Sequence, residues 1–154
     1  MAAHDHRALL QALDQRARDS LSSVYFARKA AAEEIRANYP PDAQAQALAE
    51  LGDAVQADSD AALFALRCPD PCLDALAGSL GAPRSVRVND RISLITTVRD
   101  TEAELYRADD GTYGLVWESA ALMRERTRAA AELDLIKKNG AQYRMQRKLS
   151  PGER

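Results

Sequence analysis

The chain has 154 residues, enough for one domain with its own hydrophobic core. Apolar residues make up 46% of it but aromatic residues only 5%, so much of the apolar content is alanine, a strong helix former. A net charge of −2 excludes attraction of the whole surface to DNA or to anionic membranes. No apolar stretch approaches the roughly 20 residues of a membrane span, and the first residues lack the layout of a signal peptide. We therefore expect a cytoplasmic protein, and the alanine- and arginine-rich composition suggests a bacterial one.

Residues 5–66 predict an antiparallel helical hairpin. Apolar residues at three- and four-residue steps predict a first helix from 5 to 38. Tyr39-Pro40-Pro41 ends it, because proline lacks the backbone donor that a helix interior needs. A second helix is expected from 42 to 66, and a short link between two long helices favours an antiparallel arrangement.

Charged residues interrupt the apolar stripes of this hairpin. Arg28 lies in the first stripe, and Asp58 lies in the second. Residues 28 and 53 are about equally far from the turn, so Arg28 is expected to pair with Asp53. Two interpretations follow: an ion pair that sets the helix register, or a polar groove formed by Arg28, Asp53 and Asp58 that receives a ligand.

The two cysteines flank the start of a short helix predicted over residues 70–80. Cys68 and Cys72 lack the C-x-x-C redox spacing, and in a cytoplasmic protein we expect reduced thiols with a structural role. An alternative is a thiol- or metal-dependent enzyme that uses both cysteines. His4 and His6 are the only histidines, and the combined spacing matches no standard zinc site.

Residues 84–117 predict an antiparallel β-meander of three or four strands. Apolar and polar residues alternate there, as in strands that bury one face. Asn89-Asp90 predicts one tight turn, and Asp109-Asp110-Gly111 is the strongest turn signal of the chain.

Three of the aromatic residues lie in the last predicted hairpin. Tyr106, Tyr113 and Trp117 are expected to face the helices as part of the core. Exposure of the same residues would instead make them anchors for a partner. If the protein binds another protein, we expect that binding to depend on exposed apolar residues such as Phe26 or Phe64.

The whole pattern predicts an α+β fold with one domain over residues 1–149. Ser119 is a suitable cap for a long helix from 119 to 139, which basic residues and Gly140 end. This helix and the hairpin are expected to pack on one face of the meander. Residues 150–154 are expected to form a frayed tail.

Basic residues gather in three places: the first hairpin of the meander, one face of the last helix, and the C-terminal segment. Glu153 is the one acidic residue after residue 136, which gives that segment a charge of +5 and leaves residues 1–136 at −7. If the meander lies beside the last helix, the three groups form one phosphate-binding stripe. The candidate partner or phosphate contacts are Arg84, Arg87, Arg91, Arg124, Arg128, Lys137, Lys138, Arg144, Arg147 and Lys148.

No catalytic constellation is recognisable in the sequence. It lacks a Gly-x-Ser-x-Gly elbow and a phosphate-binding glycine loop, so no catalytic, cofactor-binding or metal-binding residue is assigned. We favour a non-catalytic protein that binds another protein: a small bacterial adaptor, chaperone or inhibitor of the immunity-protein type. The acidic balance of residues 1–136 would suit a basic protein partner, and alanine-rich helices allow a homodimer. The alternative is a nucleic-acid-binding protein that uses the Arg84–Arg91 hairpin and the basic C-terminal segment; no membrane partner is expected.

Overall fold

The sequence-predicted α+β fold is confirmed, and a computed structural model describes it for residues 5–149. The predicted tail at 150–154 lies outside the described residues. The helices are α1 (His6–Ala12), α2 (Gln15–Asn38), α3 (Pro41–Ala49), the 3-10 helix η1 (Gly52–Val55), α4 (Asp60–Arg67), α5 (Asp70–Ser79) and α6 (Ser119–Leu149). The strands β1 (Pro83–Asn89), β2 (Ile92–Thr97), β3 (Glu102–Arg107) and β4 (Tyr113–Leu115) form an antiparallel sheet in the order of the chain.

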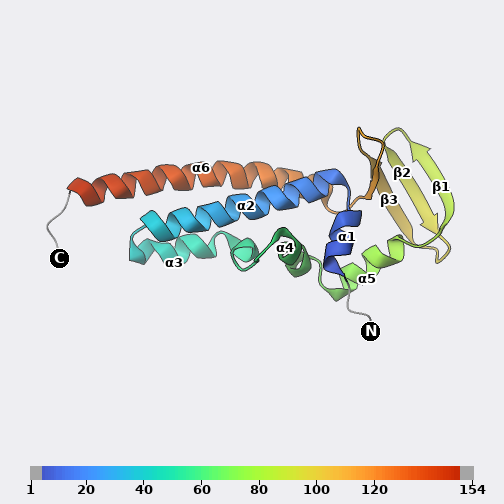
Figure 1. The fold of residues 1–154 in the computed structure, drawn as a ribbon, viewed down its shortest axis with the longest axis horizontal. Coiled ribbons are helices and arrows are strands. Elements are labelled where there is room, and N and C mark those ends of the chain that lie inside the picture. The colour runs from blue at the N-terminus through green and yellow to red at the C-terminus, as the bar shows by residue number, and fades with distance from the viewer. Residues whose placement is uncertain (1–4, 150–154) are drawn as a thin grey trace.

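Two long helices form the axis of the molecule. α2 and α6 lie side by side and run in the same direction, away from the sheet, which stands at their N-terminal ends (Figure 1). The predicted helical hairpin is present in outline, because α3, η1 and α4 return along α2 toward the sheet. None of the helices in residues 5–149 has the length and apolar content needed to cross a membrane.

The first predicted helix is wrong in one respect, because residues 13–14 divide it into α1 and α2. The Asp14 carboxylate accepts hydrogen bonds from the backbone N–H groups of Arg16 and Ala17, and so caps α2. Leu13 forms a bridge to Leu115 of β4, and the Asp14 N–H donates to the Leu115 carbonyl at 2.8 Å. The apolar pattern continues through the break because Leu13 is itself buried against the sheet.

The predicted ends of two other helices are wrong. The expected second helix is divided into α3, η1 and α4: Gly52 has a left-handed φ of 72°, and the Ser59 hydroxyl caps α4. The last helix continues past Gly140 to Leu149. Gly140 is a packing position, because a Cβ there would overlap the Glu34 carboxylate of α2. The same Cβ would lie 3.3 Å from the Asn38 Cβ, so α2 and α6 are in close contact at this position.

The aromatic residues show which surfaces belong to the core. Trp117 packs edge-on against Phe64, with ring centroids 5.0 Å apart, as expected for Trp117. Phe64 is fully buried, so its predicted exposure is wrong, whereas Phe26 is 65% exposed as predicted. Tyr113 is 52% exposed, which contradicts its predicted place in the core.

The inward face of the sheet is covered at one edge and open at the other. Val88, Ser93, Leu105 and Leu115 are paired across the four strands and therefore share this face. Leu115 of β4 is buried against the helices, whereas Val88 of β1 is 67% exposed. All seven residues of β1 are exposed, because the sheet extends beyond the helices that cover β4.

Candidate functional site

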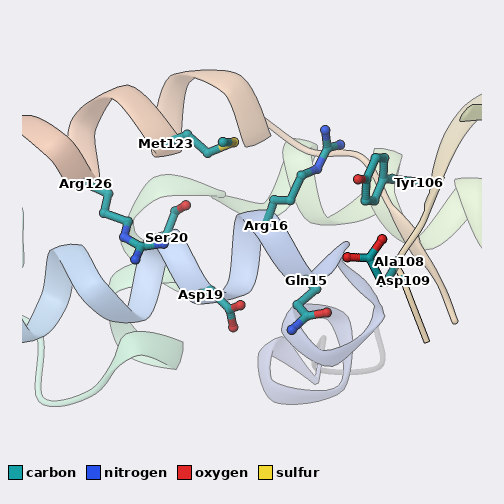
Figure 2. A pocket seen from close by; sticks show the side chains of 9 residues that line it. All are labelled: Gln15, Arg16, Asp19, Ser20, Tyr106, Ala108, Asp109, Met123 and Arg126. Atoms are coloured by element: carbon teal, nitrogen blue, oxygen red, sulfur yellow. The ribbon is translucent and has the colours of Figure 1, made fainter. Parts of the chain in front are cut away.

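A cleft of about 270 Å³ opens where α2, α6 and the turn after β3 meet. Gln15, Arg16, Asp19 and Ser20 of α2 line one side; the other lining residues are Tyr106, Ala108 and Asp109 of β3 and its turn, and Met123 and Arg126 of α6 (Figure 2). We call this hollow the α2–α6 cleft. The start of α2 and the start of α6 hold its walls together, because the Ser119 hydroxyl donates to the buried Asp14 carboxylate.

Two ion pairs close one wall of the α2–α6 cleft. The Arg16 guanidinium donates to Asp14 and lies 3.6 Å from the centroid of the Tyr106 ring. Arg91 donates to the Tyr106 hydroxyl at 3.2 Å and pairs with Asp109 at 2.7 Å. The hydrogen bond with Tyr106, followed by the negative charge of Asp109, raises the pKa of Arg91. Arg16 and Asp109 therefore already have partners of opposite charge.

Three other polar groups of the cleft have no such partner. Ser20 is 1% exposed, and its hydroxyl makes no hydrogen bond within the described residues. Leaving a buried hydroxyl unsatisfied costs about 1–3 kcal/mol. Arg126 and Asp19 line the same cleft and form no ion pair in residues 5–149. The cleft thus combines a free cation, a free carboxylate and an unsatisfied hydroxyl.

This chemistry suits binding better than covalent catalysis. Ser20 could act as a nucleophile only with a base in hydrogen-bond reach, and none lies there among the described residues. Among the described residues, the cleft lining contains no histidine and no cysteine. Its groups can therefore orient a charged molecule, and the free carboxylate of Asp19 makes no hydrogen bond that would activate the Ser20 hydroxyl.

The predicted Arg28–Asp53 ion pair is wrong. Arg28 pairs with Glu132 of α6, because α6 covers this face of α2. Asp53 pairs with Arg67 at 3.1 Å, and Arg67 also pairs with Glu125 at 2.7 Å. Burial opposes the charge of Arg67, but the hydrogen bonds to Glu125 and Asp53 outweigh it and raise the pKa of Arg67.

The predicted polar groove of Arg28, Asp53 and Asp58 is not formed. Arg28 does line a groove of about 330 Å³, but with Tyr39, Glu132 and other residues of α3 and α6. Asp53 and Asp58 lie outside this groove. The backbone carbonyl of Asp58 instead accepts a hydrogen bond from the Tyr25 hydroxyl at 2.8 Å.

The candidate phosphate contacts divide into paired and unpaired cations. The paired side chains are Arg84 with Asp100, Arg91 with Asp109, Arg128 with Glu132 and Arg144 with Glu34, and Arg147 donates to the Asn38 carbonyl. Within residues 5–149, no ion pair engages Arg87, Arg124, Lys137, Lys138 or Lys148. The expected single stripe is wrong, because α6 carries its C-terminal cations away from the sheet that holds the Arg84–Arg91 hairpin.

The expectation of reduced thiols is wrong, since Cys68 and Cys72 form a disulfide with their Cα atoms 5.1 Å apart. Cys68 ends α4 and Cys72 lies in the first turn of α5, so the intervening turn brings them within disulfide range. A thiol activity would first require reduction of this bond. No group of three or more metal-ligating side chains occurs in residues 5–149, and His4 lies outside that range.

Reduction of the disulfide should lower the free energy of unfolding by about 2 kcal/mol, the chain-entropy value for so short a loop. Thermal unfolding with and without a thiol reductant measures this change. The variant with both cysteines replaced by serine should unfold at the same temperature in both buffers. An equal response of that variant to the reductant would contradict a stabilising disulfide.

Sequence reasoning assigned no function to Asp14, Asp19 or Ser20. One signal was available: Ser20 is three residues after Ala17 and four before Val24, so it lies on the buried face of α2. Whether the Ser20 hydroxyl has a partner also depends on α6, which begins 99 residues later, and the periodicity of α2 contains no information about the residues of α6.

Comparison with protein-family models, with curated proteins and with solved structures finds no match for this chain, so its function is inferred from its geometry.

Proposed function

We propose that this is a non-catalytic binding protein that acts by protein–protein contact through the free edge of its sheet. The observation that carries this proposal is that all seven residues of β1, the first strand in the sheet order, are exposed. An edge strand presents backbone N–H and C=O groups to any extended chain that can pair with it. The proposed partner therefore contributes an extended segment that adds a strand beside β1.

Exposed apolar side chains on β1 support a specific contact. Val86 and Val88 are 51% and 67% exposed and lie on the face that is buried at the other edge of the sheet. Val86 is paired with Ile95, which in turn is paired with Ala103. A partner strand with apolar side chains on this face would extend the same apolar surface, while its backbone supplies hydrogen bonds.

The charge at β1 favours an acidic partner segment over a second copy of this chain. Arg84 and Arg87 lie in β1 and Arg91 lies in its turn. Asp100 and Asp109 neutralise Arg84 and Arg91, so Arg87 is the one of the three without an ion pair in residues 5–149. Pairing two copies along β1 would place an unpaired Arg87 on each of the two adjacent strands, whereas an acidic segment could pair with it. The acidic balance of residues 1–136 matters less here, because salt screens charges more than about 8 Å away.

Replacement of Val88 by lysine should reduce the amount of partner retained from a native lysate by at least about tenfold. The substitution removes an apolar contact from the proposed interface. It should change the stability by no more than about 0.5 kcal/mol, since the side chain is exposed. Leu135→Lys is the matched control, because Leu135 is 57% exposed but lies on α6.

The proposal is supported if one protein is retained by the wild type and by Leu135→Lys, survives nuclease treatment and is lost with Val88→Lys. Equal retention by Val88→Lys would refute contact through β1. High salt should weaken retention if the partner segment is acidic.

A second candidate function is nucleic-acid binding through the C-terminal end of α6. Lys137, Lys138 and Lys148 form no ion pair in residues 5–149, and the described chain contains no acid after Asp134. Phosphate contacts by such cations are strongly weakened by salt. The same pull-down distinguishes the two functions, because nucleic acid would be recovered at low salt and lost after nuclease treatment.

A further inference from the structure

We propose that the α2–α6 cleft binds a small zwitterion of the amino-acid type, with its carboxylate at Arg126 and Ser20 and its ammonium group at Asp19. This site is separate from β1 and does not depend on the proposed protein contact. The starting observation is the buried Ser20 hydroxyl, which lines the cleft without a hydrogen-bond partner. A ligand that accepts its hydrogen bond would remove the desolvation cost of that hydroxyl.

Arg126 identifies the group that Ser20 would meet. Its side chain extends from α6 across the cleft toward α2, where Ser20 lies (Figure 2). It forms no ion pair in residues 5–149. A guanidinium beside a hydroxyl donor matches a carboxylate, which accepts several hydrogen bonds and carries the opposite charge.

Asp19 determines what else the ligand carries. It precedes Ser20 on α2, lines the same cleft and has no ion-pair partner among the described residues. The other charged groups of the lining, Arg16 and Asp109, are already paired with Asp14 and Arg91. One free cation and one free carboxylate therefore remain. A simple anion would leave Asp19 unpaired, whereas a zwitterion neutralises both groups.

The remaining lining indicates a ligand with an apolar side chain. Met123 is 46% exposed at the cleft, and Ala108 adds a further apolar surface. Burial of such surface is favourable and needs no directional partner. Leucine is accordingly a suitable probe, because it combines the two charges with an aliphatic side chain.

The experiment is a titration of the isotopically labelled full chain with leucine, followed by NMR chemical shifts. Leucine at about 10 mM should nearly saturate a site with a Kd of about 1 mM and shift the signals of residues 15–20 and 123–126. Leucinamide, which lacks the carboxylate, and 4-methylpentanoate, which lacks the ammonium group, should each bind at least about tenfold more weakly. Binding of 4-methylpentanoate as tight as that of leucine would overturn the role of Asp19, and absence of any shift with leucine would overturn the site.

Variants of the lining residues test the assignment of each group. Arg126→Gln should raise the Kd for leucine at least about tenfold, whereas Arg124→Gln on the same helix, outside the cleft, should leave it within about twofold. Ser20→Ala should weaken leucine binding while the melting temperature stays the same or rises, because the variant buries no unsatisfied hydroxyl. Unchanged leucine affinity in Ser20→Ala and Arg126→Gln would overturn the proposal.

Discussion

Replacing Gly114 with alanine should lower the free energy of unfolding by about 3 kcal/mol or more. A Cβ atom at this position would lie 2.6 Å from both the Asp14 nitrogen and the Leu13 oxygen. Both are backbone atoms of the α1–α2 link, so no rotation of a side chain can relieve the overlap. β4 would have to move away from the helices and lose the hydrogen bond between the Asp14 N–H and the Leu115 carbonyl. Thermal unfolding followed by circular dichroism should show a Tm lower by roughly 10 °C.

Gly78→Ala is the matched control for this prediction. Gly78 lies within α5, and a Cβ there would have no atom within 4 Å. Alanine in a helix loses less conformational entropy than glycine, so this variant should be up to about 1 kcal/mol more stable than the wild type. Equal stability of the two variants would show that β4 does not lie against the α1–α2 link as the structure places it.

The sequence predicted the features that depend on neighbouring residues. The meander was predictable because its turns are local: Asp90 and Gly111 have φ values of 51° and 84°, conformations that aspartate and glycine tolerate best among the residues present there. The end of α2 was predictable for the same reason, since Pro40 and Pro41 stop a helix whatever packs against it.

Features that depend on distant residues were not predictable. The break between α1 and α2 arises where Leu13 meets Leu115, about a hundred residues away in the chain. Lys137, Lys138 and Gly140 resemble the end of a helix, yet α6 continues to Leu149, and Gly140 is buried against Glu34 and Asn38 of α2. In both cases the helix boundary that the local sequence predicts is overridden by contacts with residues far away in the chain.

The candidate site shows the same limit more strongly. Arg28 was predicted to lie opposite Asp53 because residues 5–66 were expected to form a hairpin of two helices that pack only on each other. In the structure α6 runs parallel to α2 and supplies Glu132 as the partner of Arg28. The α2–α6 cleft exists for the same reason, since Arg126 approaches Ser20 through this helix pairing. No spacing within either helix specifies which residues of the other it meets.

Removal of the Asp14 carboxylate should be as damaging as the change at Gly114. Asp14 is fully buried and accepts hydrogen bonds from the backbone of Arg16 and Ala17, from the Arg16 guanidinium and from the Ser119 hydroxyl. Asp14→Ala would leave these donors without an acceptor where α1, α2, β4 and α6 meet. The expected loss is about 3 kcal/mol, because the buried donors lose their acceptor while the Arg16 guanidinium, which is partly exposed, can still be hydrated.

Asp5→Ala provides the comparison that separates this role from ordinary helix capping. Asp5 caps α1 through the N–H of Ala8, but it is exposed, and within residues 5–149 its side chain bonds no other element. Its loss should cost about 1 kcal/mol. Asp14→Asn should fall between the two, because the amide oxygen can still cap α2 while the charge that pairs with Arg16 is gone. Denaturant unfolding of the three variants measures this order. A cost for Asp14→Ala no larger than that for Asp5→Ala would mean that Asp14 merely caps α2, and that the junction of helices and sheet is held by apolar contacts alone.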